Sequence, residues 1–479
     1  MTSALVVGSG PNGLAAAITL AASGVDVTVV EAGRRIGGGT RSSELTLPGL
    51  MHDECSAFHP LSIDTAFSRL AGLERHGLRW AWADVQYSHP LDGGAGAAAL
   101  RSVGETAAGL GPDDRAWKQV FGPLVGRFGE ITPHLLGPLM RVPRHPVGLC
   151  QFGLRAAAPV SVLVKRFSSE AARGLYAGVA AHAFWSFRSV LSSAIGTVLG
   201  TAAHASGWPV AVGGSAAITT AMANALTERG GTIETGRRVG SVDEFGSFDL
   251  VMLDVSPRAA IELVGDAMPA RFRRSLSGYR HGPAAFKVDF AVEGGVPWSH
   301  LPSRRAGTVH VGGTFREIAT SESMVVRGQM PDRPFVLVGQ QYLADPGRSV
   351  GDVHPVYSYA HVPSGFTGDV TEAIERQIER FAPGFRDRIL ARHVQSTAAL
   401  SARNANVVRG DIVTGANSPR QLVFRPRGGV DPYWIGVQGH FLCSAATPPG
   451  AGAHGMCGYN AARSALRSIG RHCADDSGG

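Results

Sequence analysis

Three hydrophobic patterns follow one another at the start of the chain. Residues 4–7 are a short apolar run, residues 14–22 are rich in Leu, Ala and Ile, and residues 25–30 alternate and end at Glu31. The turn Gly8-Ser-Gly-Pro-Asn-Gly13 separates the first two patterns. This order predicts a strand, a Gly-rich turn, a helix and a second strand, which together form a βαβ unit.

Similar α/β patterns return much later in the chain. Residues 216–229 predict a helix, residues 230–239 a strand, and residues 248–255 a buried strand. Near the C-terminus, residues 441–462 predict a strand, a loop rich in Pro and Gly, and a helix that begins near Ala453. Strands and helices that alternate in this way are typical of an α/β fold.

The middle of the chain has a different pattern. Residues 66–205 are expected to be helical. Four β-rich runs, punctuated by Gly and Pro, then predict a sheet, which we expect to be antiparallel. These runs are 285–290, 307–311, 334–338 and 356–362.

The glycine turn predicts a dinucleotide site because each position has a physical task. Gly8 makes the tight turn, Gly10 lets the backbone approach a pyrophosphate, and Gly13 allows helix and strand to pack closely. The helix N-terminus then faces the phosphates, and Glu31 reaches a ribose hydroxyl pair. An ordinary Gly-rich loop is the alternative, but strand, turn, helix, strand and acid all occur in the required order.

Composition indicates a folded protein and narrows its partners. The 479 residues include 45 basic and 38 acidic side chains, a net charge of +7, and 44% hydrophobic residues. Only Lys118, Lys165 and Lys287 are lysines, and no basic helix or RNA-recognition motif occurs, so we expect no nucleic-acid partner. The five cysteines contain no C-x-x-C pair, which argues against a disulfide framework.

The sequence lacks the motifs of several other enzyme classes and of secreted or membrane-spanning proteins. The chain has no HExxH, GxSxG or P-loop motif and no paired Cys/His spacing, so neither a metal site nor a hydrolase is expected. A signal peptide would be a basic segment followed by an apolar one, and no such segment precedes the first strand. No apolar run reaches the roughly 18 residues that a membrane-spanning helix needs. We therefore expect a cytoplasmic protein that is free or lies on a membrane surface.

Two further motifs carry a family resemblance. Arg34-Arg-Ile-Gly-Gly-Gly39 follows Glu31 at close range, and residues 441–462 form a second Gly-rich motif. Together with residues 41–60, they resemble the phytoene-desaturase-like and carotenoid-isomerase-related branch of the amine-oxidase-type flavoproteins. That resemblance covers nearly the whole chain and implies non-covalently bound FAD. It also implies a set of cofactor-binding residues: Gly8, Gly10, Pro11, Asn12, Gly13, Glu31, Ala32, Arg35, Gly38, Gly39, Val239, Gly450, His454, Gly455 and Met456.

The resemblance also implies the domain organisation. A discontinuous, Rossmann-like FAD-binding domain is expected at 1–65, 206–275 and 400–479. An inserted α+β substrate domain is expected at 66–205, its helical part, and at 276–399, its antiparallel sheet. The sequence does not indicate the oligomeric state of the protein.

The function implied by the resemblance is hydride transfer between flavin N5 and a C–C bond of an apolar, isoprenoid or polyene-like substrate. A desaturase oxidises the substrate, whereas a saturase or an isomerase uses reduced flavin, with NAD(P)H as an electron donor to be considered. The resemblance also leaves open an amine oxidase and a non-catalytic prenyl- or lipid-binding escort protein. Such flavin chemistry requires few protein acids or bases.

Five polar side chains are candidate catalytic groups. His52 and His59 come shortly after the flavin motif, where the chain of such proteins passes the isoalloxazine. Tyr357, Tyr359 and His361 share one face of a predicted strand and could form a polar wall. The competing interpretations are hydrogen bonding within a loop for the first pair, and core burial or edge exposure for the three strand residues.

Residues 131–188 predict either a membrane-facing patch or a buried cap. Glu170 is the only acid between Ile131 and Thr227, while seven Arg and Lys residues alternate with apolar ones up to Arg188. Basic residues that flank apolar stretches suit an anionic lipid surface through which a lipid-soluble substrate enters. The apolar helix expected at 190–199 either lines a tunnel or fills the core.

Overall fold

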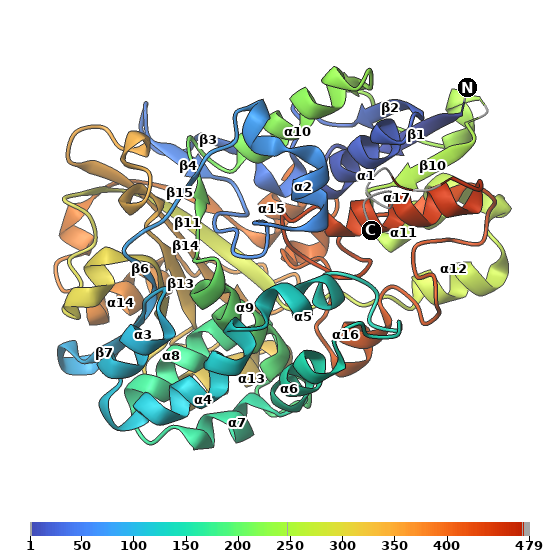
Figure 1. Cartoon of the computed structure of the whole chain (residues 1–479). Helices are drawn as coiled ribbons and strands as arrows, with labels where there is room; N and C mark the ends of the chain where they lie inside the picture. Colours follow the sequence, from blue (N-terminus) through green and yellow to red (C-terminus); the bar gives the residue numbers. More distant parts are fainter. Residues whose placement is uncertain (1, 247, 472, 474–479) are drawn as a thin grey trace.

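The computed structural model describes residues 2–246, 248–471 and 473, which form two main sheets with helices around them (Figure 1). The first is a parallel five-stranded sheet of order β16-β10-β1-β2-β9. Its strands are β1 (Ser3–Val7), β2 (Asp26–Glu31), β9 (Thr232–Thr235), β10 (Leu250–Leu253) and β16 (His440–Leu442). These strands come from segments far apart in the sequence, so the Rossmann-like sheet is discontinuous along the chain.

Helices α1 (Pro11–Ala22), α10 (Ala216–Glu228) and α17 (Met456–Ser468) pack with this sheet. Helix α1 begins at Pro11, a residue suited to the first helical turn because its missing N–H would be unpaired there. Helices α1 and α17 touch so closely that a Cβ on Gly458 would lie 1.8 Å from the carbonyl oxygen of Asn12. This contact fixes the C-terminal motif against the glycine turn.

The second sheet has seven strands in the order β15-β11-β14-β13-β12-β6-β7. The four predicted strands are β11 (Ala284–Glu293), β12 (Ala306–Val311), β13 (Val336–Gly339) and β14 (Val353–Val362). The structure corrects two expectations here. The segment 66–205 is not only helical, because β6 (Val85–Pro90) and β7 (Gly96–Ala99) extend the sheet, and the sheet is not wholly antiparallel, because β6 pairs parallel with β12. Strand β15 (Ile389–Gln395) was not predicted either.

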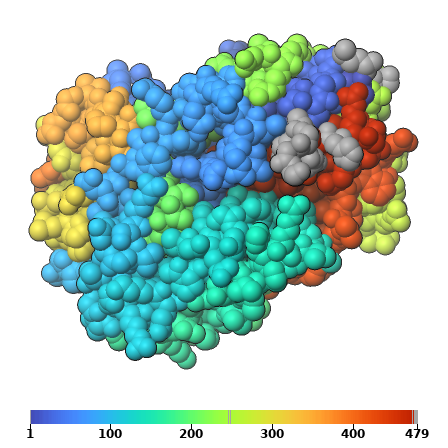
Figure 2. Space-filling view, in the orientation of Figure 1, coloured from blue at the N-terminus to red at the C-terminus, as the bar shows by residue number. Residues whose placement is uncertain are grey.

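Helices of the 66–205 segment cover one side of this sheet, and in the surface view they form the lower face (Figures 1 and 2). They are α3 (Val103–Gly109), α4 (Asp114–Val125), α5 (Phe128–Leu135), α6 (Pro146–Ala156), α7 (Val160–Leu163), α8 (Glu170–Ala181) and α9 (Ser193–Ala205). Helix α2 (Ala66–Ala71) lies instead beside α1 and α17. The helix expected at 190–199 is α9, which begins later and runs further. No single helix of the described residues is long and apolar enough to cross a membrane, although α6 and residues 160–166, bent by 92°, pass that test together.

The other strands and helices of the described residues are short or lie outside these two groups. They are β3 (Ser42–Glu44), β4 (Met51–Asp53), β5 (Trp80–Ala81), β8 (Val210–Ala211), α11 (Pro257–Val264), α12 (Ala270–Ser277), α13 (Phe315–Val326), α14 (Thr371–Phe381), α15 (Thr397–Arg403) and α16 (Pro419–Phe424).

A buried ion pair joins the two halves of the molecule. Arg348 Nη1 donates to Asp53 Oδ2 at 2.6 Å, and both side chains are almost fully excluded from solvent. Ser42 Oγ and the Ser215 backbone N–H donate to the other carboxylate oxygen of Asp53. Burial raises the pKa of Asp53, but Arg348 and these two donors outweigh it, so its pKa lies below the ordinary value.

Candidate functional site

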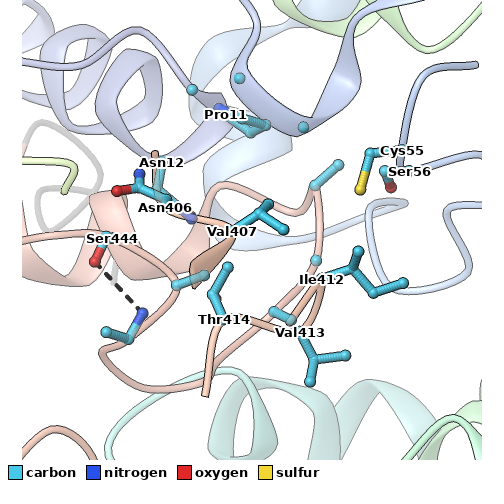
Figure 3. A pocket seen from close by; sticks show the side chains of 18 of the residues that line it. Pro11, Asn12, Cys55, Ser56, Asn406, Val407, Ile412, Val413, Thr414 and Ser444 are labelled. Carbon is cyan, nitrogen blue, oxygen red and sulfur yellow. Dashed lines mark hydrogen bonds between the residues drawn. The ribbon is translucent and has the colours of Figure 1, made fainter. Parts of the chain in front are cut away.

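One cavity of about 1090 Å³ runs from the glycine turn to the apolar helices beneath it. Its upper part is formed by the ends of β1, β2 and β10 and by the C-terminal motif. Figure 3 shows Pro11 and Asn12 above Asn406 and Val407, with Cys55 and Ser56 on the other side. The carboxyl ends of parallel strands meet at this edge, where α/β sheets bind their ligands.

The glycine turn has the shape that a pyrophosphate requires. A Cβ on Gly10 would lie 2.6 Å from Asp254 Oδ2, and one on Gly13 would lie 2.1 Å from the carbonyl oxygen of Gly8. Gly38 has a φ of +51°, and a Cβ added to it would lie 3.1 Å from the Gly10 Cα. Only glycine fits these positions without a clash, so the turn, Gly38 and the N-terminus of α1 can approach one another closely.

Most of the predicted cofactor residues line this cavity. They are Gly8, Gly10, Pro11, Asn12, Glu31, Ala32, Gly38, Gly39, Val239 and His454. Asn12 Oδ1 is buried without a hydrogen-bond partner, an unmet requirement that a ligand donor would satisfy. The glycine cradle and this orphaned oxygen fit a bound dinucleotide, and the role of each residue toward it stays a prediction.

Glu31 is held firmly at the end of β2. Ser9 donates to Oε2 from its backbone N–H at 3.0 Å and from its hydroxyl at 2.7 Å, and the Gly33 N–H donates to Oε1 at 2.7 Å. Arg41 Nη2 lies 3.5 Å from Oε1. These contacts fix the carboxylate at the cavity wall, where the sequence places a ribose.

Arg35 lies elsewhere than its predicted role requires. Its Nη2 donates to Glu54 Oε1 at 2.8 Å, and its side chain does not contribute to the cavity wall. Arg41 lines the cavity instead, and its Nη2 donates to the carbonyl oxygen of Arg35 at 2.7 Å. The ion pair with Glu54 uses the Arg35 guanidinium, so Arg41 is the better placed cation.

The C-terminal motif folds back against the glycine turn. Helix α17 begins at Met456 rather than near Ala453, because Gly455, with a φ of +68°, is its N-cap residue. The Met456 N–H donates to His454 Nδ1 at 3.1 Å, and burial lowers the pKa of His454 to about 4. His454 is therefore neutral at the cavity wall. Gly450, whose carbonyl accepts from Cys457 Sγ, lies just behind it.

The lower part of the cavity is apolar. Its wall comes from α5, α6, α9 and α16 and from the loop before α16. Polar residues among those that line the cavity include His182, His281, Thr308, Thr414 and Asn417. The apolar residues of this wall are Leu135, Leu136, Leu139, Leu149, Phe152, Ala156, Leu191, Ala194, Ile195, Val198, Leu199, Ile412, Val413, Leu422 and Val423. Helix α9 thus lines a tunnel as well as filling the core.

His52 and His59 are buried in the framework and do not line this cavity. His52 Nε2 shares a hydrogen bond with the Thr46 hydroxyl at 2.8 Å, and its Nδ1 lies 3.6 Å from Asp289 Oδ1. His59 Nε2 lies 2.9 Å from Ser215 Oγ, and burial lowers its pKa to about 4. Both therefore act here as hydrogen-bonding groups within the framework rather than as groups that face a ligand.

The three residues predicted on one strand face separate into two groups. Tyr357 and Tyr359 line the cavity, with ring centres 5.8 Å apart and planes at 88°. The Tyr357 hydroxyl donates to the carbonyl oxygen of Cys55 at 2.5 Å. His361 instead pairs with Glu322 Oε1 at 2.8 Å and stacks on Phe184, so it is screened from the cavity.

Asp254 and His182 are polar residues of the cavity wall that the sequence does not predict. Asp254 directly follows β10, and its Oδ2 accepts the Gly13 N–H at 3.0 Å. The pKa of Asp254 is raised to about 7, mainly by burial. The Gly13 and Gly10 N–H groups act to lower this pKa, and the Glu31 carboxylate acts to raise it. His182 Nε2 lies 3.0 Å from His310 Nε2, and burial lowers the pKa of His182 to about 3, so this pair is uncharged.

Metal and disulfide chemistry find no support in the part of the chain that the structure describes. No group of three or more His, Cys, Asp or Glu side chains there could hold a metal ion. No disulfide joins Cys55, Cys150, Cys443 or Cys457 to another described cysteine.

Comparisons with known proteins agree with this fold. Residues 6–71 match the family model of the NAD(P)-binding Rossmann-like domain. The chain is 24% identical over 548 residues to pyridine nucleotide-disulfide oxidoreductase domain-containing protein 2 of Mus musculus, covering 97% of this chain and 93% of that protein.

Solved structures are similar over nearly the whole chain. An oxidoreductase from Methanosarcina mazei has a TM-score of 0.61 and 13% identity, with 98% of this chain and 100% of that chain covered. Putrescine oxidase bound to putrescine has a TM-score of 0.58 and 18% identity, with 98% and 99% covered. The chain therefore has a Rossmann-like dinucleotide-binding region within the α/β fold that these proteins share.

Proposed function

We propose that this protein is an FAD-dependent oxidoreductase that transfers a hydride between the flavin and a C–C bond of an apolar, polyene-like substrate. The observation that carries the proposal is the continuity of one cavity from the glycine turn to the apolar wall. A dinucleotide in the upper part and an apolar substrate in the lower part would meet near Cys55 and Tyr357. Such a site is consistent with pockets that are largely apolar with a few convergent polar groups.

A bound FAD would supply the hydride acceptor or donor that no side chain of the protein can supply. The chain's own residues bind, orient and exclude water. Gly10 and Gly38 leave room for the pyrophosphate, and Glu31 is held where a ribose is expected. Tyr357 and Tyr359 form an aromatic wall that is uncharged, because burial raises the pKa of both phenols and keeps them protonated.

An amine oxidase is the second candidate, and one observation favours it. Tyr357 and Tyr359 form a nearly perpendicular aromatic pair on the cavity wall, in a fold shared with putrescine oxidase. The lower cavity, however, has no carboxylate in its wall. Burial lowers the pKa of His182 there, and His281 Nδ1 lies 3.3 Å from Asp411 Oδ2. A cationic amine would lack a counter-charge there, so an uncharged substrate fits better.

We further propose that the substrate enters from the surface of an anionic membrane, with the protein on the cytoplasmic side. The exposed apolar residues Val142 and Leu154 lie in and beside α6, whose other face lines the cavity through Phe152 and Ala156. Arg141, Arg144, Lys165, Arg166 and Arg188 are exposed in the same segment. A peripheral patch of this kind combines burial of apolar side chains with attraction to anionic lipid.

Vesicle binding tests this entry route. Val142 is 90% and Leu154 73% exposed, and Val430 and Leu301 elsewhere are 85% and 67% exposed, so they form a matched control pair. We expect Val142→Asp/Leu154→Asp to lose co-sedimentation with phosphatidylserine-containing vesicles, while Val430→Asp/Leu301→Asp keeps it. Equal binding by both variants, or no binding by the parent protein, would refute the route.

Anaerobic spectroscopy tests the reaction itself. The visible flavin spectrum of the purified protein is followed after adding NADPH or NADH, and separately after adding polyenes or primary amines. Bleaching by the polyene indicates a desaturase, bleaching by NAD(P)H a saturase or a reductively activated isomerase, and bleaching by an amine an amine oxidase. A protein that remains colourless after FAD is added would favour a lipid-binding escort protein instead.

A further inference from the structure

A second cavity, of about 1280 Å³, lies on the far side of helix α16 from the first. It is bounded by α12, residues 278–283, the end of α13 and α16. Leu422 and Val423 of α16 face the first cavity, whereas Arg420, Gln421 and Phe424 face the second. Helix α16 thus forms part of the wall between the two cavities, and His281 lines both of them.

The wall of this cavity is strongly basic. No Asp or Glu lines it, and four exposed arginines contribute to it: Arg271, Arg274, Arg280 and Arg420. Within the described residues none of these four forms an ion pair, whereas their neighbour Arg273 pairs with Asp266 at 3.3 Å. Arginine keeps its charge at any physiological pH, so the cavity holds several cations without counter-charge.

Two unpaired donors and the repulsion between two arginines also indicate that the second cavity suits an anion. Burial lowers the pKa of Arg427, Asp431 opposes that change, and Arg271 adds to it by like-charge repulsion. Arg427 Nε and Trp185 Nε1 are buried donors without hydrogen-bond partners, and both residues line the cavity. An anion with several acceptor oxygens would satisfy these donors and relieve the repulsion.

The cavity is also built rather than accidental in shape. Gln421 Nε2 donates to the carbonyl oxygens of Arg280 and Ala416, and the Arg280 N–H donates to Gln421 Oε1 at 2.8 Å. These bonds tie α16 to residues 278–283. Trp185 and the exposed ring of Phe424 add planar apolar surface beside the cations.

We propose that this second cavity binds a phosphate-bearing ligand, with its phosphate oxygens on the guanidinium groups of α12 and α16 and its apolar or planar part against Phe424 and Trp185. Guanidinium forks match phosphate geometry bidentately. The phosphate group comes either from a soluble nucleotide or diphosphate or from a phospholipid headgroup. The inference does not depend on the redox function proposed above.

Calorimetric titration tests it on protein saturated with FAD, so that the glycine turn is already occupied. The soluble probes are pyrophosphate and ADP, and the membrane probe is phosphatidylcholine vesicles with and without phosphatidate. The test variant is Arg274→Ala/Arg420→Ala. Its control is Arg115→Ala/Arg316→Ala, which removes two exposed arginines that line neither cavity.

We expect the test variant to bind its probe about a hundredfold more weakly than the parent protein, at about tenfold for each lost charge-assisted contact. The control should stay within about twofold, because exposed arginines that touch no ligand contribute little. Loss of pyrophosphate or ADP binding assigns a soluble ligand, and loss confined to phosphatidate vesicles assigns a headgroup. Equal affinities of the two variants, or no binding of any probe, would overturn the proposal. If FAD does not load, pyrophosphate binding that survives Arg274→Ala/Arg420→Ala reports the glycine turn and counts against the second site.

Discussion

Asp254 offers the sharpest test of the glycine turn because its carboxyl group lies buried between Gly10 and Gly13. Burial raises its pKa from 3.8 to about 7 in the native protein. The native state therefore holds a proton that the unfolded chain releases near its ordinary pKa. The resulting stability is fully present below the unfolded pKa and is lost as the pH rises through about 7.

The substitution Asp254→Asn removes this dependence while it keeps an oxygen for the Gly13 N–H. Between about pH 5 and pH 8 the parent protein loses about two pKa units of stability at this site, on the order of 3 kcal/mol at about 1.36 kcal/mol per unit. The variant should therefore gain on the order of 3 kcal/mol relative to the parent over this interval. Other titrating groups cancel in the comparison.

Urea unfolding of both proteins at the two pH values measures this difference. Asp84→Asn is the control, because Asp84 is exposed and pairs with the equally exposed Arg305. If the stability difference between Asp254→Asn and the parent is the same at both pH values, the reasoning about Asp254 is wrong. Loss of a negative charge from the turn should also tighten FAD binding above pH 7, which flavin titration at the two pH values would show.

Two further predictions concern the framework and the turn. Arg348→Met leaves the Asp53 carboxylate buried without its cation and should cost about 3–5 kcal/mol of unfolding free energy, whereas Arg305→Met, at an exposed ion pair, should cost less than about 1 kcal/mol. Similar losses of the two variants in urea unfolding would contradict this. Gly10→Ala places a Cβ 2.6 Å from a carboxylate oxygen and should lower the FAD bound per chain at least severalfold, while Gly129→Ala, whose Cβ meets nothing within 4 Å, should not. Equal flavin content in both variants would count against the assignment of the turn.

The dinucleotide-binding half could be predicted because its signals are local. The glycine turn, the helix that follows it and the acid at the end of the next strand are all set by neighbouring residues. Strand β6, Val85–Pro90, was missed because all six of its residues are buried, polar and apolar alike, so no alternation marks it. Strand β7, Gly96–Ala99, is made of Gly and Ala, which have little strand preference.

The candidate site was harder to predict because its members are distant in sequence. Asp254 meets Gly13 across 241 positions, and His182 meets His310 across 128. Their place just after residues 34–39 makes His52 and His59 candidates, but their side chains bond Thr46 and Ser215. Position along the chain brings a side chain near the cavity, whereas its hydrogen bonds decide whether it faces the cavity.

The central claim is that the cavity at the glycine turn holds FAD. The most direct measurement is the flavin content of the purified protein, read from its visible spectrum after addition of FAD and removal of the unbound fraction. We expect one FAD per chain, released on denaturation because it is bound non-covalently. A protein that stays colourless under these conditions would contradict the assignment of FAD to this cavity.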